Sequence, residues 1–133
     1  MSVLAIYPNQ FNINCVNLLE PRPNSIIDGV FSKLLYGDEL YLMNGLTICV
    51  PVCSKTIHTD YISIIAFIEH ELLKLVDNKA ATFSRIVDTI TTKYTITNLI
   101  APNGLSENLL IKISGIWENK QGSTGLSFRC STI

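Results

Sequence analysis

The amino-acid sequence predicts an α+β fold, in which an antiparallel sheet built from an N-terminal and a C-terminal hairpin carries one or two central helices. Segments near both ends of the chain alternate apolar and polar residues, which is typical of half-buried strands. A central segment, 61–77, instead repeats its apolar residues at helical spacing. The chain of 133 residues has the length of one ordinary domain, so we expect 1–133 to form a single domain.

The N-terminal part begins with an alternating segment, residues 11–19, which predicts a half-buried strand. The two prolines that follow, Pro21 and Pro23, break regular structure and hold the residues before them in extended conformations. One side of the predicted strand carries Phe11, Ile13 and Cys15, and the asparagines between them face largely the other way.

A hairpin is expected between these prolines and the central helix. Val30–Tyr36 predicts a strand, and Leu40–Met43 predicts a second one that runs directly into Asn44-Gly45. Asn-Gly between apolar runs is the strongest short-range signal for a two-residue hairpin turn, because both residues tolerate positive φ. We therefore expect Leu46–Val52 to return from that turn as the partner strand.

The clearest helix is expected over Tyr61–Asp77, with Thr59 or Asp60 as its N-cap. We interpret Glu69–Glu71 as part of the solvated face of this helix. The apolar side chains share an arc of about 120° on a helical wheel. They are Tyr61, Ile64, Ile65, Ile68, Leu72, Leu75 and Val76.

The next segment, Thr82–Thr97, supports two interpretations. Its apolar residues share a helical face as far as Tyr94, whereas the threonine-rich run within it is β-branched and favours a strand. We expect a helix up to about Tyr94, and the choice between helix and strand stays open for residues 89–100.

The C-terminal part predicts a second hairpin, because Leu109–Trp117 and Gly125–Cys130 alternate apolar and polar residues on either side of a polar turn. The alternation places Trp117 and Phe128 on the apolar face, where packing in the core is their expected role. A glycine inside a strand often marks a bulge or a close backbone approach. We therefore expect Gly115 to lie beside a large side chain, either Trp117 or Phe128.

The chain carries few charges, since 16% of its residues are charged against about 25% in typical soluble proteins. Either Asn, Ser and Thr supply the polar surface instead, or a partner covers part of the surface. The formal net charge of −1 argues against a strongly basic nucleic-acid-binding protein but is compatible with a local basic strip. The longest apolar run, 62–68, is too short to cross a bilayer, so we expect no membrane insertion.

The sequence contains no nucleophile elbow, no phosphate-binding glycine loop and no dinucleotide fingerprint. His58 and His70 do not have the spacing of metal ligands on a helix, and the four cysteines include no Cys-x-x-Cys pair. We expect reduced thiols and neither a metal nor a cofactor. The sequence therefore predicts a protein that is not an enzyme and that acts by contacting other macromolecules.

Two sets of residues are candidates for such contacts. Phe67 lies on the polar side of the central helix near Lys74, and these two residues are candidates for contact with a protein partner. Aromatic side chains beside cations are typical of proteins that bind single-stranded nucleic acid, and Phe31 and Trp117 belong to hairpins that also carry cations. The candidates for nucleic-acid contact are Lys33, Tyr36, Tyr41, Lys112, Lys120 and Arg129.

Two pairs of segments resemble small proteins of large eukaryotic DNA viruses, namely Asn24–Gly37 with Leu40–Leu46, and Lys112–Glu118 with Gly125–Arg129. The resemblance implies a viral protein made in the host cytoplasm or nucleus, with the virion as a further location, and it carries no catalytic residue. The function we favour is a structural or assembly protein that binds other virion proteins or itself. The alternative is a single-stranded nucleic-acid-binding protein associated with viral DNA replication.

Overall fold

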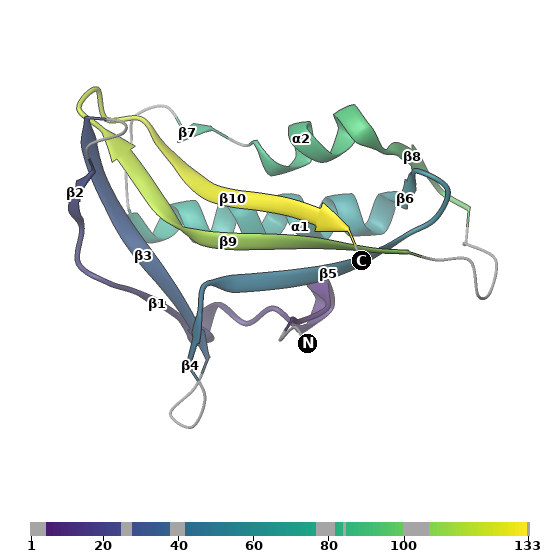
Figure 1. The fold of residues 1–133 in the computed structure, drawn as a ribbon, viewed down its shortest axis with the longest axis horizontal. Coiled ribbons are helices and arrows are strands. Elements are labelled where there is room, and N and C mark those ends of the chain that lie inside the picture. Colours follow the sequence, from purple (N-terminus) through teal and green to yellow (C-terminus); the bar gives the residue numbers. More distant parts are fainter. Residues whose placement is uncertain are drawn as a thin grey trace.

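The computed structural model of the chain describes residues 5–24, 28–37, 42–76, 82–83, 85–99 and 107–132. These residues form a mostly antiparallel β-sheet with two α-helices packed on it (Figure 1). The predicted α+β class is therefore confirmed.

The centre of the sheet is its longest described strand, β9 (Glu107–Asn119). One edge of β9 pairs antiparallel with β10 (Thr124–Thr132), which confirms the predicted C-terminal hairpin. Two strands share the other edge: β5 (Leu46–Val52) pairs with residues 107–113, and β3 (Gly29–Gly37) pairs with residues 115–119. Three strands, β10, β5 and β3, therefore pair directly with β9.

The other strands are short and lie around this centre. β3 pairs along its far edge with β1 (Val16–Leu18) and β2 (Arg22–Asn24), and at its end with β4 (Leu42–Asn44). The start of β10 pairs in parallel with β7 (Thr82–Phe83). A separate parallel pair consists of β6 (Thr56–His58) and β8 (Thr95–Thr97). Short 3-10 helices occupy η1 (Pro8–Gln10), η2 (Ile13–Cys15) and η3 (Lys74–Val76).

The prediction that Asn44-Gly45 is a hairpin turn is wrong. β4 pairs with the preceding strand β3, through Tyr36 opposite Met43, and not with β5. Residues 38–41 lie outside the described residues. Gly45 instead forms a corner between two partners. Its N–H donates to the carbonyl of Leu34 on β3 at 2.9 Å, and the chain then continues onto β9 as β5. The backbone at this corner has a φ of +92°, which glycine adopts readily and other residues rarely adopt.

The strand predicted over residues 11–19 forms only in part. Asn12 caps a 3-10 turn instead, because its side-chain oxygen accepts a hydrogen bond from the N–H of Asn14 at 3.0 Å. Short polar side chains compete with strand pairing in this way. The chain becomes extended again at Val16 and then pairs with β3 as β1.

The central helix α1 (Thr59–Leu73) confirms the strongest helical prediction and continues as η3. Its N-cap is His58 and neither predicted residue, because the Nδ1 atom of His58 accepts a hydrogen bond from the N–H of Asp60 at 3.1 Å. Leu75 was expected on the buried face but is 44% exposed. The second helix, α2 (Ile86–Lys93), ends just before Tyr94 as predicted, and β8 follows, so residues 89–97 contain both a helical end and a strand.

Both helices pack on the same face of the sheet, where they bury one continuous core (Figure 1). The opposite face of β3, β9 and β10 carries no helix in the part of the chain that the structure describes. An antiparallel sheet with one covered and one open face is a common arrangement. Fully buried side chains in this core include Leu34, Ile48, Ile111 and Ile113 from the strands, Ile65, Ile68 and Leu72 from α1, and Ile86 and Ile90 from α2.

Glu69 is buried, so the interpretation of Glu69–Glu71 as a solvated face is wrong at its first residue. Only 1% of Glu69 is exposed. Its two carboxylate oxygens accept hydrogen bonds from the N–H of Arg85 at 2.9 Å and from the N–H of Ile86 at 3.3 Å. These donors begin α2, where Arg85 supplies no side-chain cap. A carboxylate from α1 thus caps α2, which favours the helix through its free N–H groups and its dipole.

The Glu69 carboxyl group makes folding depend on pH. Burial raises its pKa, the two backbone N–H groups partly oppose that rise, and Asp88 adds to it. The folded protein therefore holds this proton more tightly than the unfolded chain does. The stabilising contribution is complete below the unfolded pKa of about 4.3 and is lost as pH rises through the raised pKa of the folded state.

We expect the free energy of unfolding of the wild type, minus that of Glu69→Gln, to fall as pH increases from about 4 upward, because only the wild type loses this proton. Urea unfolding at a series of pH values measures the difference. Glu71→Gln is the matched control and should keep the wild-type pH dependence, because it leaves Glu69 in place. Identical pH profiles for the wild type and Glu69→Gln would contradict this account.

Candidate nucleic-acid interface

A β-bulge in β9 decides which side chains reach the open face of the sheet. The pairing of β9 with β10 shifts between Ile113, which is opposite Phe128, and Gly115, which is opposite Ser127. Ser114 is the extra residue, and a single extra residue reverses the alternation of every side chain beyond it. Ile116 is therefore buried in the core at 2% exposure, and Trp117 lies on the open face. The predicted core position of Trp117 is wrong for this reason.

Beyond the bulge, one row of residues crosses four strands. Arg22 on β2 is opposite Phe31 on β3, Phe31 is opposite Trp117 on β9, and Trp117 is opposite Gly125 on β10. Paired residues of an antiparallel ladder point to the same face of the sheet. This row therefore places one cation and two aromatic rings side by side on the open face.

Two further rows on the same face supply more cations. Lys33 on β3 is opposite Gly115. On the other side of the bulge, Lys112 is opposite Arg129 on β10. We call the following residues the open-face strip: Arg22, Phe31, Lys33, Lys112, Trp117 and Arg129.

Both rings of the strip lie against glycines. A Cβ atom added to Gly115 would lie 2.5 Å from Cζ of Phe31, and one added to Gly125 would lie 2.7 Å from Cε2 of Trp117. The prediction that Gly115 lies beside a large side chain is confirmed, but that side chain is Phe31 of β3. The absence of a Cβ atom lets each ring approach the backbone closely, and both rings are half-buried.

The cations of the strip are largely exposed. Arg22, Lys33 and Arg129 are exposed and Lys112 is half-buried. None of the four forms an ion pair with another residue in the described ranges of the chain. The formal net charge of −1 therefore conceals a local concentration of positive charge on the open face.

The structure separates the six predicted nucleic-acid contacts. Lys33, Lys112 and Arg129 lie together in the strip. Tyr36 lies in the core at 5% exposure, where its hydroxyl accepts a hydrogen bond from the N–H of Asn12 at 3.0 Å. Tyr41 lies outside the described residues. Arg22 was missed because it lies between Pro21 and Pro23, which indicated a break in regular structure.

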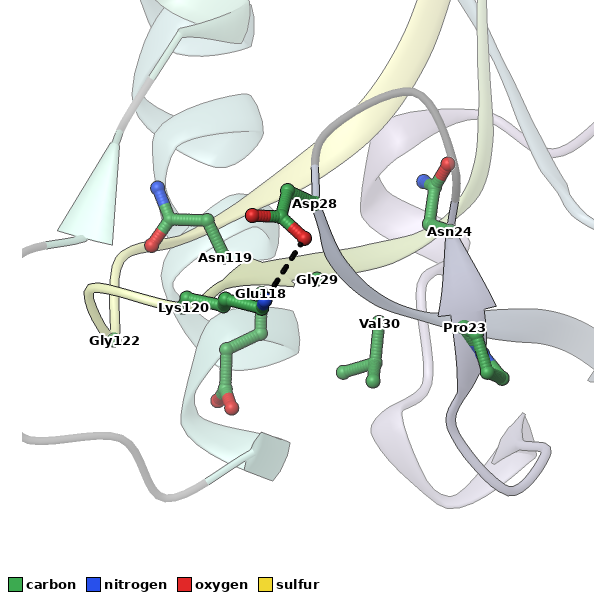
Figure 2. Close-up of a pocket in the computed structure, with 9 residues that line it drawn as sticks. All are labelled: Pro23, Asn24, Asp28, Gly29, Val30, Glu118, Asn119, Lys120 and Gly122. Carbon is green, nitrogen blue, oxygen red and sulfur yellow. Dashed lines mark ion pairs between the residues drawn. The ribbon is translucent and has the colours of Figure 1, made fainter.

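Lys120 lines a hollow at the end of the sheet, together with Asn24, Asp28 and Asn119 (Figure 2). Its Nζ atom forms an ion pair with Oδ1 of Asp28 at 3.2 Å. The side-chain oxygen of Asn119 accepts hydrogen bonds from the N–H groups of Gln121 and Ser123 and so stabilises the turn. These polar groups serve the ends of the strands, and Lys120 is not part of the strip.

The two candidates for protein contact lie on the helical side of the molecule, Phe67 on α1 and Lys74 at the start of η3. Phe67 is 57% exposed. Lys74 is exposed and forms an ion pair with Oε1 of Glu71 at 3.4 Å. The strip and these two residues therefore belong to different surfaces.

Metal and thiol chemistry have little support in the described parts of the chain. No group of three or more His, Cys, Asp or Glu side chains there could hold a metal ion. All four cysteines are free, and burial raises the pKa of the Cys49 and Cys130 thiols, which disfavours their reactive thiolate forms. No described helix is long and apolar enough to cross a membrane.

No protein-family model, no curated protein and no solved structure matches this chain. The assignment of a function therefore depends on the chemistry of the open-face strip and of the other surfaces.

We expect Gly115→Val to destabilise the fold by about 2 kcal/mol or more, because the added side chain overlaps the ring of Phe31 and the backbone of Ser32. Thermal unfolding followed by circular dichroism measures the loss. Ser131→Val is the control, since it adds a branched side chain at an exposed position of β10 on the same open face of the sheet. Equal stability of Gly115→Val and the wild type would show that Phe31 is not held against Gly115.

Proposed function

We propose that the protein binds single-stranded nucleic acid on the open face of its sheet. The observation that carries this proposal is the row in which Phe31 and Trp117 lie side by side, flanked by cations and uncovered by any described helix. In the viral setting implied by the sequence resemblance, the ligand is single-stranded DNA exposed during replication.

The aromatic pair supports stacking of bases. Rings that lie on the surface of a sheet give bases a flat partner, and such stacking tolerates any base because every base has a π face. Phe31 and Trp117 occupy paired positions on adjacent strands, and each is held close to the backbone by a glycine beneath it. Two neighbouring bases can therefore stack without moving the sheet.

The cations support binding of the sugar–phosphate backbone. Along β9, Trp117 and Lys112 are five residues apart, which corresponds to about 15 Å of strand. The strip can therefore contact about three nucleotides, and its arginines and lysines lie on both sides of the aromatic pair. Phosphate contacts of this kind make binding strongly dependent on salt.

We expect labelled single-stranded DNA to bind with an affinity that falls as salt increases. Lys33→Gln and Arg129→Gln should each lower the slope of log affinity against log salt by about 0.7, because each removes one phosphate contact. Phe31→Leu should weaken binding by about tenfold with little change in the slope, since it removes a stacking surface and no charge. Fluorescence polarisation at several salt concentrations measures all three effects.

Lys74→Gln is the matched control for the charge variants, because it removes a lysine from the helical side of the molecule. It should leave both the affinity and the salt slope unchanged. Absence of binding at low salt, or equal effects of Lys33→Gln and Lys74→Gln, would contradict the proposal.

An assembly function has separate support from an apolar groove on the side of the sheet that the helices occupy. Leu19 and Leu75 are 45% and 44% exposed, and both line this groove of about 290 Å³ together with Leu18, Pro21 and Val76. Exposed apolar residues that gather in one place are typical of protein contact sites. This second candidate corresponds to a virion protein that binds other virion proteins or itself.

For the assembly function we expect the wild type to self-associate as its concentration rises and Leu75→Asp to stay monomeric, because a carboxylate in the groove opposes apolar contact. Sedimentation velocity measures the association. Leu42→Asp is the control, since Leu42 is exposed on β4 but does not line the groove. A wild type that stays monomeric at every concentration would contradict self-association as the basis of the assembly function.

A further inference from the structure

A hollow of about 380 Å³ lies at one end of the open-face strip, beside Phe31. Its size falls in the range of sites that bind small molecules. It is formed where β2 returns along the edge of β3. The residues that line it are Leu19, Glu20, Arg22, Pro23, Asn24, Phe31 and Lys33.

The walls of the hollow match the parts of a nucleotide. Phe31 and the exposed side chain of Leu19 supply apolar surface for a base. Arg22 and Lys33 are exposed and line the same hollow, where they can contact phosphates on either side of that base. The hollow therefore offers apolar surface to one base and cations to its neighbouring phosphates, at the end of the strip.

Glu20 is the feature that sequence-independent binding does not explain. It is exposed and lines the hollow, and it forms no ion pair with another described residue even though Arg22 is two residues away. A carboxylate at this place repels phosphate and so opposes the contribution of Arg22 and Lys33. Its presence suits a different role, because an ionised carboxylate accepts hydrogen bonds from amines.

We propose that the hollow binds one base that carries an exocyclic amine, with this amine donating a hydrogen bond to the carboxylate of Glu20. The inference rests on the proposed function and adds a base preference to it. Cytosine presents an amine at its 4-position, whereas thymine presents a carbonyl oxygen there. The carboxylate attracts the first group and repels the second, so the site selects cytosine over thymine.

The two pyrimidines give a sharp test because they have the same ring size and stack alike. We expect oligo-dC to bind the wild type about three to ten times more tightly than oligo-dT of equal length at neutral pH and fixed salt. In Glu20→Gln this ratio should fall toward one, with oligo-dT gaining affinity, because the amide has no charge and can donate to the thymine oxygen. Fluorescence polarisation with both labelled strands measures the ratio.

Glu107→Gln is the matched control, because it removes an exposed carboxylate at the start of β9, whereas the hollow lies beside Phe31, which pairs with the end of β9. It should change the two affinities equally and keep the ratio. Equal binding of oligo-dC and oligo-dT by the wild type, or a ratio unchanged in a folded Glu20→Gln, would overturn the base preference and leave the proposed function standing. Failure of both strands to bind at low salt would overturn the proposed function itself.

Discussion

The sheet depends on one constraint, which is that β9 pairs with two different strands along a single edge. β5 occupies residues 107–113 of that edge and β3 occupies residues 115–119. Ser114 lies at the junction between them and is also the extra residue of the bulge toward β10. The chain turns the same corner at Gly45, where a Cβ atom would lie 2.9 Å from the carbonyl oxygen of Ile113. The bulge and the corner thus occupy one place in the sheet, and bends of this kind commonly combine a bulge with a glycine.

The bulge also separates the chemistry of the two faces. Before it, β9 contributes Ile111 and Ile113 to the core, and after it Ile116 continues the same core. Because the bulge reverses the alternation of side chains, Trp117 lies on the same face of the sheet as Phe31. The helical side is in turn fixed by Glu69, whose carboxylate joins α1 to the start of α2. Both helices pack on one face, and no described helix covers the strip on the other.

Features that depend on local sequence periodicity could be predicted, and features that depend on distant partners could not. α1, β3 and the C-terminal hairpin follow from repeats within one segment. The role of Gly45 depends on β9, a strand that begins 62 residues later at Glu107. The burial of Glu69 agrees with its place four residues after Ile65, within the apolar stripe of the helix. A glycine inside a strand is typical of either a bulge or a close backbone approach, and Gly115 is at both. Of the strip, the sequence identified Lys33, Lys112 and Arg129 but not Arg22, because β2 lies in a segment that its prolines marked as irregular.

The position of Trp117 has a spectroscopic consequence, since it is the one tryptophan of the chain. Indole emission here reports on the half-buried surface between β3, β9 and β10, on the side away from the helices. Far-ultraviolet circular dichroism, by contrast, is dominated by helices, and α1 and α2 lie on the other side. The indole signal therefore reports on this face of the sheet without any label, and a change in it that leaves the far-ultraviolet signal unaltered indicates an event at this face that preserves the helices.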